Sequence, residues 1–182
     1  METKEHNLKS DDPLRKMRNA ISVFLVDDDK TYLATLEYYL NQQLQSKIKI
    51  EPFINGEDCL KEIETNPTTE IVILDYYLNT ELSNSMNSEV AMQDYYLNPE
   101  SSNTMNGLEV LKKIKEINPE IIVIMLSAED KLEIAIDCIT YGAYEYVVKS
   151  ETAFIRTQNI LKNLIHAVAL QPYYPPDIGG ES

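Results

Sequence analysis

The stretch Phe24-Leu25-Val26-Asp27-Asp28-Asp29 decides how the chain is interpreted, because an apolar strand ends directly in three acids. Two later apolar runs also end in charged residues. Ile71–Leu74 is followed by Asp75, and Tyr146–Val148 is followed by Lys149. Carboxylates that meet at one sheet edge repel each other by about 4 kcal/mol per pair at about 4 Å and an effective dielectric near 20. A fold keeps such a cluster when a metal ion or a lysine lies within it. The pattern therefore predicts a functional site at which carboxylates surround a metal ion or a lysine.

Strands and helices alternate from residue 20 onward. In chain order the expected elements are strand Ile21–Val26, helix Lys30–Leu44, strand Ile48–Phe53, helix Glu57–Glu64, strand Ile71–Leu74, helix Gly107–Ile117, strand Ile121–Leu126, helix Lys131–Thr140, strand Tyr144–Val148 and helix Glu151–Leu170. Such alternation is typical of an α/β fold, here a doubly wound five-stranded parallel sheet with right-handed crossovers and helices on both faces. Sheets of this kind bind ligands at the carboxyl ends of their strands.

Length and composition predict one domain with two tails. We expect an N-terminal tail over residues 1–19, a domain over 20–171 and a disordered tail over 172–182, where prolines and glycines gather. The net charge of -14 argues against direct nucleic-acid binding. No apolar run is long enough to span a membrane. Cys59 and Cys138 lack metal-ligand spacing, and the chain starts without a secretion signal, so a cytoplasmic protein with reduced thiols is predicted.

A duplicated segment interrupts the regular pattern. The run Asp75-Tyr76-Tyr77-Leu78-Asn79 recurs as Asp94-Tyr95-Tyr96-Leu97-Asn98. Two copies alone cannot stack into the core of a repeat protein. We therefore interpret the repeat as a tandem duplication within one loop, an insertion over about residues 79–105, with a short extra helix expected over 88–97.

The duplication makes two acids compete for one position at the end of the third strand. Asp75 follows Ile71–Leu74, which suits a buried strand. Asp94 follows Gln93, whose amide would cost about 1–3 kcal/mol if it were buried without a partner. The sequence favours Asp75. In the alternative interpretation the chain shifts its register and Asp94 takes the position.

Five short fragments carry a further signal through their order along the chain. They are Val26-Asp27-Asp28, Leu74-Asp75, Asn106-Gly107-Leu108-Glu109, Leu126-Ser127-Ala128 and Tyr146-Val147-Val148-Lys149. On an alternating strand–helix frame, this ordered set resembles the receiver domain of two-component response regulators. The resemblance covers residues 20–170 apart from the insertion. It implies a flavodoxin-like sheet with strand order 2-1-3-4-5.

The resemblance also implies a reaction and a metal. Asp75 would be the phosphoacceptor, taking a phosphoryl group from a histidine kinase or a phosphotransfer protein. Mg²⁺ would be bound directly by Asp28 and Asp75, through water by Asp27, and by the carbonyl oxygen of Tyr77. Together with the metal, Lys149 would neutralise charge on the transferring group.

The resemblance implies that two more residues respond to phosphorylation of Asp75. Ser127 would hydrogen-bond the acyl phosphate, and Tyr146 would move with it as an aromatic switch. Ser150 departs from the family pattern, which usually has proline after the lysine, so the Lys149–Ser150 peptide is either cis or trans. The last helix is followed by too few residues for a DNA-binding domain. Output would pass to a downstream protein target or a homodimer.

Two other functions stay open from the sequence. A phosphatase similar to the haloacid dehalogenases would use the signature Asp27-Asp28-Asp29-Lys30-Thr31, with Ser127 and Lys149 as further motifs, but the acidic pair expected after the lysine is missing. The second option is an interaction module with a receiver-like fold that cannot be phosphorylated. In the receiver interpretation, Asp29 is expected to face solvent or to lie in the first helical turn.

Overall fold

The computed structural model describes residues 20–65, 68–78 and 105–170, and every structural statement below concerns these ranges. Three predictions lie outside the described residues. These are the tail over 1–19, the tail over 172–182, and nearly all of the insertion, including Asp94 and the extra helix expected over 88–97. Within the described ranges, no helix combines the length and the hydropathy that crossing a membrane requires.

Five parallel strands form one sheet in the order β2-β1-β3-β4-β5, which confirms the predicted order. The strands are β1 (Ile21–Val26), β2 (Ile48–Phe53), β3 (Ile71–Asp75), β4 (Ile122–Ser127) and β5 (Glu145–Val148). After β1 the chain first forms β2 on one side and then crosses to form β3 on the other side. The carboxyl ends of β1 and β3 therefore flank the point where the strand order reverses, which is where such sheets bind ligands.

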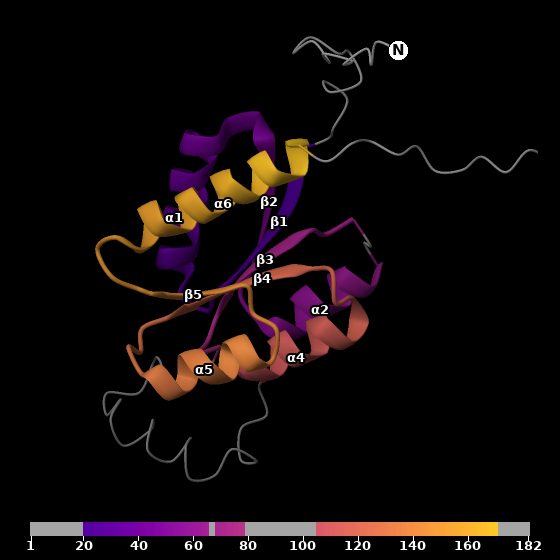
Figure 1. Ribbon diagram of the computed structural model, residues 1–182, viewed down its shortest axis with the longest axis vertical. Coiled ribbons are helices and arrows are strands. Elements are labelled where there is room, and N and C mark those ends of the chain that lie inside the picture. Colours follow the sequence, from indigo (N-terminus) through magenta and orange to yellow (C-terminus); the bar gives the residue numbers. More distant parts are fainter. Residues whose placement is uncertain (1–19, 66–67, 79–104, 171–182) are drawn as a thin grey trace, which may run out of the picture.

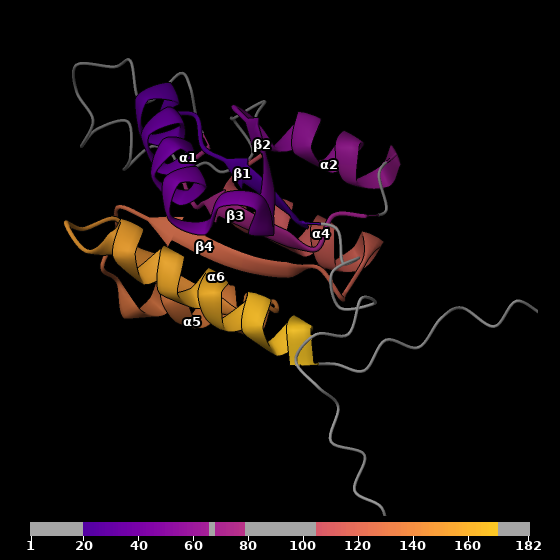
Figure 2. The same cartoon turned by 90° about the horizontal axis from the view of Figure 1, so that it is seen from above.

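Helices cover both faces of the sheet, as Figures 1 and 2 show. One face carries α1 (Lys30–Leu44) and α6 (Ala153–Leu170), and the other carries α2 (Gly56–Thr65), α4 (Gly107–Ile117) and α5 (Leu132–Thr140). The doubly wound α/β class predicted from the sequence is thus confirmed.

The sheet separates two apolar cores. Successive side chains of a strand point to opposite faces. In β1, Val23 and Leu25 accordingly pack with α1 and α6, whereas Phe24 and Val26 pack with α2 and α4. All four are almost fully buried. Burial on both faces explains why β1 has a continuous apolar run instead of alternating polar and apolar residues.

Most element boundaries differ from the predictions by no more than one or two residues. The last helix begins at Ala153, because the residues before it form a turn in which the Ala153 N–H donates to the Ser150 carbonyl oxygen at 3.0 Å. A short 3-10 helix, η2 (Gln45–Lys47), follows α1 and was not predicted; Gln45 has a positive φ of 51°. The third strand extends by one residue, so Asp75 itself belongs to β3.

The start of α4 lies directly against the end of β3, although the insertion separates them in sequence. The Gly107 N–H donates to the Tyr76 carbonyl oxygen at 2.9 Å. A Cβ at position 107 would overlap the carbonyl oxygen of Asp75 and lie 2.8 Å from the Cα of Tyr76. Asn106 and Glu109 form a capping box that fixes the first turn of α4. The backbone around Asp75 is therefore held in place by both segments.

Candidate functional site

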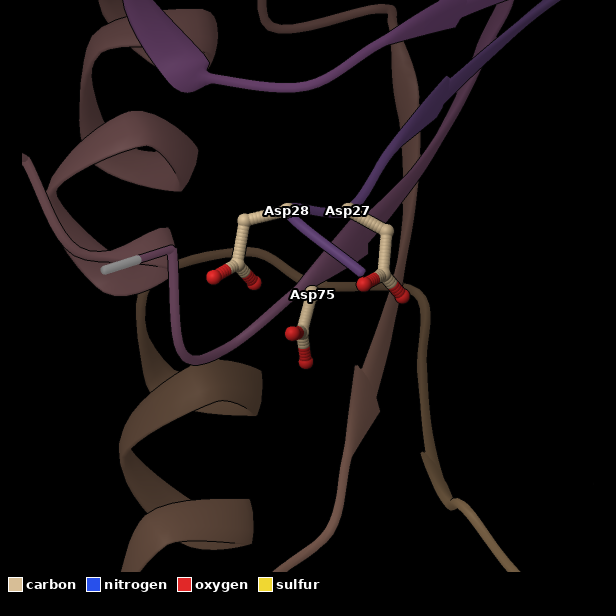
Figure 3. Close-up of side chains that lie close together, drawn as sticks. All are labelled: Asp27, Asp28 and Asp75. Carbon is tan, nitrogen blue, oxygen red and sulfur yellow. The ribbon is translucent and has the colours of Figure 1, made fainter. Parts of the chain in front are cut away.

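Three carboxylates gather at the carboxyl ends of the adjacent strands β1 and β3 (Figure 3). Asp27 and Asp28 directly follow β1, and Asp75 ends β3. Each offers an oxygen, and these oxygens all lie within 4.8 Å of one another. Asp27 and Asp75 are only 3% and 4% exposed, whereas Asp28 is half-buried. The sequence predicted that these strand-end acids would converge, and the structure brings them together.

Lys149 supplies the positive charge in this cluster. It follows β5, and its Nζ lies 2.8 Å from Asp27 Oδ2 and 2.9 Å from Asp75 Oδ2. Its backbone N–H donates to the Ser127 carbonyl oxygen at 2.7 Å. No peptide bond in the described ranges is cis, so the Lys149–Ser150 peptide is trans. The lysine therefore reaches both acids without the proline that usually follows it in the family.

Burial shifts the pKa values of the three charged groups. Burial raises the pKa of Asp75 to about 7; the nearby Lys149 opposes this shift and Asp27 adds to it. Burial also raises the pKa of Asp27, again against the effect of Lys149. Burial by itself would lower the pKa of Lys149, but Asp75 and Asp27 outweigh it and raise that pKa. The lysine therefore stays protonated, yet it only partly offsets the burial of two carboxylates.

The cluster retains unused capacity to bind a cation. Asp75 Oδ2 pairs with Lys149, whereas the buried Asp75 Oδ1 has no hydrogen-bond partner among the described residues. A buried carboxylate oxygen without a partner is unfavourable. Three carboxylates with oxygen ligands and excess negative charge suit Mg²⁺, a hard cation that prefers oxygen. The residues present therefore fit a divalent metal ion.

Asp29 has a different task from its two neighbours. Its exposed side chain accepts hydrogen bonds from the backbone N–H groups of Thr31 at 2.9 Å and Tyr32 at 3.1 Å, so it is the N-cap of α1. The prediction that Asp29 faces solvent is confirmed, and its capping role is an addition. The dehalogenase-like signature pairs Asp27 with Asp29. In the structure Asp28 joins the acidic cluster instead.

Ser127 and Tyr146 both bind the same residue of the loop after β4. The buried Ser127 Oγ accepts a hydrogen bond from the Glu129 N–H at 3.1 Å. The Tyr146 hydroxyl donates to the Glu129 carbonyl oxygen at 2.8 Å, and burial raises the pKa of that hydroxyl. Ser127 also lies beside the acids, because Asp75 is in register with the preceding residue, Leu126. Serine, tyrosine and loop thus form one connected unit next to the cluster.

The chain after Asp75 is anchored before the insertion begins. The Tyr76 N–H donates to the Leu126 carbonyl oxygen at 2.8 Å. The half-buried Tyr77 packs its ring edge-on against Tyr76, with 4.9 Å between the ring centroids, and Leu78 is buried in the core. A metal-binding role for the Tyr77 carbonyl oxygen stays a prediction.

Sequence reasoning missed Tyr32. Its ring centroid lies 4.5 Å from Lys149 Nζ. The spacing of the leucines predicts helix α1, but that pattern says nothing about Tyr32. A usable signal was its position in the first turn after Asp29, because a helix that starts at the carboxyl edge of the sheet places its first turn beside the acids.

Comparison with known families points to one of them. The family model described as the response regulator receiver domain matches residues 100–159. This segment includes Ser127, Tyr146 and Lys149. The three clustered acids precede it in the sequence and lie outside the match. No curated protein matches the sequence significantly.

Solved structures are similar over most of the chain. A CheY-like receiver domain protein from Methanospirillum hungatei JF-1 is 19% identical, with a TM-score of 0.61, over 81% of this chain and 95% of that one. The BeF3-activated receiver domain of DrrB, a Thermotoga maritima protein, is 25% identical, with a TM-score of 0.55, over 80% and 97%. The CheX-CheY-BeF3-Mg complex from Borrelia burgdorferi is 21% identical, with a TM-score of 0.58, over 79% and 89%. Together with the sheet order, these similarities show that the chain has the fold of receiver domains, and residues 100–159 match the response regulator receiver domain model.

Proposed function

We propose that this chain is the phosphoacceptor signalling module of a two-component system, with Asp75 as the residue that takes the phosphoryl group. The observation that carries the proposal is the placement of Asp75. It is a buried carboxylate with one oxygen paired to Lys149 and the other without a partner among the described residues, beside two further acids. The free oxygen is available to attack phosphorus or to bind a cation.

The reaction is a displacement at phosphorus. A carboxylate oxygen of Asp75 forms a bond to the phosphorus of a phosphohistidine as the phosphorus–nitrogen bond breaks, and the electron pair of that bond returns to the histidine. Such transfers depend on positioning and on charge stabilisation. Lys149 is already within 2.9 Å of Asp75, so its ammonium group can bind an oxygen of the transferring group without a large movement. Attack by water on the same phosphorus later releases inorganic phosphate and restores the carboxylate.

Mg²⁺ is the metal that we assign to the acidic cluster. Asp28 and Asp75 would hold it directly, Asp27 would act through water, and the Tyr77 carbonyl oxygen would complete the protein ligands. When bound, the ion would neutralise negative charge on the phosphoryl oxygens. Two similar structures support this assignment, since the DrrB receiver domain is BeF3-activated and the CheX-CheY complex contains both BeF3 and Mg²⁺.

Ser127 and Tyr146 would transmit the conformational effect of phosphorylation to the surface that binds a partner. In our proposal the Ser127 hydroxyl exchanges its bond to Glu129 for one to the acyl phosphate, and Tyr146 moves with the loop that both residues hold. The face formed by α5, β5 and α6 would then bind the partner. Several apolar side chains on it are exposed, namely Leu132, Ile136, Ile139 and Ile155.

The partners are a histidine kinase or phosphotransfer protein upstream and a protein target downstream, with a homodimer as the second option for output. We place the reaction in the cytoplasm. The two cysteines support this location, since Cys59 and Cys138 are both free and buried. A receiver in complex with another protein has a precedent in the CheX-CheY complex.

The structure favours the receiver over the two alternatives. A dehalogenase-like phosphatase would need Asp29 in the cluster, but Asp29 caps α1 instead. A module unable to accept phosphate would follow if the insertion had displaced the acceptor strand. Instead, β3 carries Asp75 to within 2.9 Å of Lys149.

Acetyl phosphate treatment tests the proposal and separates the alternatives. The wild-type protein, Asp75→Asn and Asp94→Asn would be incubated with acetyl phosphate and Mg²⁺, reduced with borohydride and mapped by mass spectrometry. We expect modification at position 75 in the wild type and in Asp94→Asn, and none in Asp75→Asn. Modification at position 94 would overturn the assignment of Asp75. No modification would support the interaction module, and rapid turnover of p-nitrophenyl phosphate would support the phosphatase.

A further inference from the structure

The ammonium group of Lys149 has three protons, and the two carboxylates take only part of that capacity. Asp27 Oδ2 and Asp75 Oδ2 lie 2.8 Å and 2.9 Å from Nζ. The ring of Tyr32 lies on a further side, with its centroid 4.5 Å from Nζ. An ammonium group within about 6 Å of a ring centroid is attracted by the negative face of the aromatic ring. The lysine is therefore held from α1 as well as from β1 and β3.

We propose that Tyr32 is a positioning residue for Lys149, and that its ring holds the ammonium group in place while the acceptor carboxylate changes its chemical state. This inference rests on the function proposed above. Before the reaction the Asp75 carboxylate pairs directly with the ammonium group. After the reaction that carboxylate is part of an acyl phosphate. The Tyr32 ring does not take part in the chemistry, so its contact with Nζ can remain the same throughout.

A neutral aromatic ring suits this position better than another acid. The cluster already contains three carboxylates and one lysine, and Asp75 has a pKa raised to about 7 by burial. A further carboxylate would add repulsion and raise that pKa more. The ring attracts the ammonium group without adding charge, and it excludes water from one side of the ion pairs.

The ring itself is held rigidly. The Tyr32 N–H is bound by the N-cap Asp29 at 3.1 Å, which fixes the first turn of α1. From α6, Phe154 packs edge-on against Tyr32, with 5.3 Å between the ring centroids. The edge-to-face arrangement is a favourable geometry for two aromatic rings. Helix α1 therefore orients the ring, and α6 supports it.

The hydroxyl of Tyr32 does not explain why the residue is there. Among the described residues, the buried Tyr32 Oη has no hydrogen-bond partner. Burial raises the pKa of this hydroxyl to about 12, so the side chain is a neutral phenol at ordinary pH. Without a bond or a charge, the hydroxyl contributes nothing that would hold Lys149. The ring face is what matters, and phenylalanine should replace tyrosine here.

Three variants separate the ring from packing and from stability. Tyr32→Phe keeps the ring and removes the unpartnered hydroxyl. Tyr32→Leu removes the ring and keeps an apolar side chain. Tyr39→Leu is the matched control, because Tyr39 is also on α1 and also packs on Phe154, at 5.6 Å between centroids, but it bonds Gln158 instead of contacting the acids. A fourth protein would carry pentafluorophenylalanine at position 32, which keeps the ring shape and reverses the charge of its face.

The first measurement uses the metal-free protein and does not depend on phosphorylation. Protons attached to the Lys149 side-chain carbon next to Nζ lie near the ring, so their NMR signals should be displaced by its ring current. We expect the displacement in the wild type, in Tyr32→Phe and in Tyr39→Leu, and its loss in Tyr32→Leu. An undisplaced signal in the wild type would overturn the proposed placement of the lysine. This result does not depend on whether Asp75 accepts a phosphoryl group.

The second measurement is the rate of phosphorylation by acetyl phosphate in Mg²⁺, a small donor that needs no kinase docking. We expect Tyr32→Leu and the fluorinated protein to be slower by about three- to tenfold, in line with a cation–π contact. Tyr32→Phe and Tyr39→Leu should stay within about twofold of the wild type. If Tyr32→Phe were as slow as Tyr32→Leu, or if the fluorinated protein kept the wild-type rate, the positioning role would be wrong. A wild type that is not phosphorylated at all would refute the proposed function, and the NMR measurement would still decide where the ring lies.

Discussion

Lys149 Nζ lies 2.9 Å from Asp75 Oδ2, although the two residues follow strands β5 and β3, which β4 separates in the sheet. A long side chain from one strand end thus crosses a neighbouring strand to reach a buried acid. Together with the contact to Asp27, this ion pair ties three strands of the sheet together at one edge. The consequences of the arrangement can be measured.

Loss of the lysine should destabilise the metal-free protein. In Lys149→Met the buried Asp27 and Asp75 would both lose the ammonium group that they pair with, and breaking a buried pair on one side costs about 3–5 kcal/mol. Urea unfolding at pH 8 with a chelator measures the loss. The loss should shrink at pH 5, where Asp75 is protonated. Lys131→Met is the control, since Lys131 pairs with Glu129 at the surface and should cost far less. Equal losses in both variants would contradict the prediction.

The stability of the metal-free protein should depend on the ionisation of Asp75. Its pKa is raised from 3.8 in an ordinary peptide to about 7 in the folded protein, mainly by burial. The folded state therefore holds a proton that the unfolded chain has lost. This stabilising contribution is complete below about pH 4 and is lost as the pH rises through about 7. Urea midpoints measured from pH 4 to pH 8 should fall, and they should fall less in Asp75→Asn.

Asp29→Asn serves as the control for that pH profile. Asp29 is exposed, and asparagine is an equally good N-cap, so this variant should follow the wild-type profile. Addition of Mg²⁺ at pH 8 should restore stability in the wild type more than in Asp75→Asn, because a cation offsets the charge that burial makes unfavourable. A profile that is the same with and without Asp75 would show that its carboxylate titrates near the ordinary value.

Gly107→Ala should be destabilising although alanine is ordinarily the better helix residue by about 1 kcal/mol. A Cβ at this position would overlap the Asp75 carbonyl oxygen and press on the Tyr76 backbone. These are backbone atoms of a central strand and its continuation, so they cannot move aside cheaply. We expect a net loss of about 1–3 kcal/mol in the free energy of unfolding. Ala34→Gly on the exposed side of α1 calibrates the helix term in the opposite direction.

A surface ion pair should matter little by comparison. Arg156 Nη2 lies 2.8 Å from Glu145 Oε1, but the two side chains are 52% and 38% exposed. Water competes for both groups and salt screens them, so Arg156→Ala should cost no more than about 1 kcal/mol. Unfolding in low and high salt measures the pair. A loss as large as that of Lys149→Met would mean that geometry, and not burial, sets the strength of ion pairs in this protein.

The sequence determined which segments form strands and helices and at which edge of the sheet the acids meet, because apolar runs of strand length and leucines at helical spacing can be recognised without knowing the distant contacts. That is why β1, α1 and β2 begin and end at the residues predicted for them. It also explains why Asp27, Asp28, Ser127 and Lys149 could be assigned to one edge. The strand order 2-1-3-4-5 was implied only by the resemblance to receiver domains, and the tertiary structure confirms it. The fate of Asp94 and of the insertion lies outside the described residues, and the role of Asp75 as acceptor stays a prediction until it is mapped chemically.

The tertiary structure alone decided which neighbours each charged group meets. The resemblance to receiver domains already separated Asp28 from the solvent-facing Asp29, but only the tertiary structure shows that Asp29 caps α1 through the N–H groups of Thr31 and Tyr32. Tyr32 lies against Lys149 only because the lysine side chain, which follows β5, extends to the sheet edge where α1 begins. The raised pKa of Asp75 likewise depends on burial by segments far apart in the chain. Electrostatic interactions vary with distance and burial, and those two quantities exist only once the chain is folded.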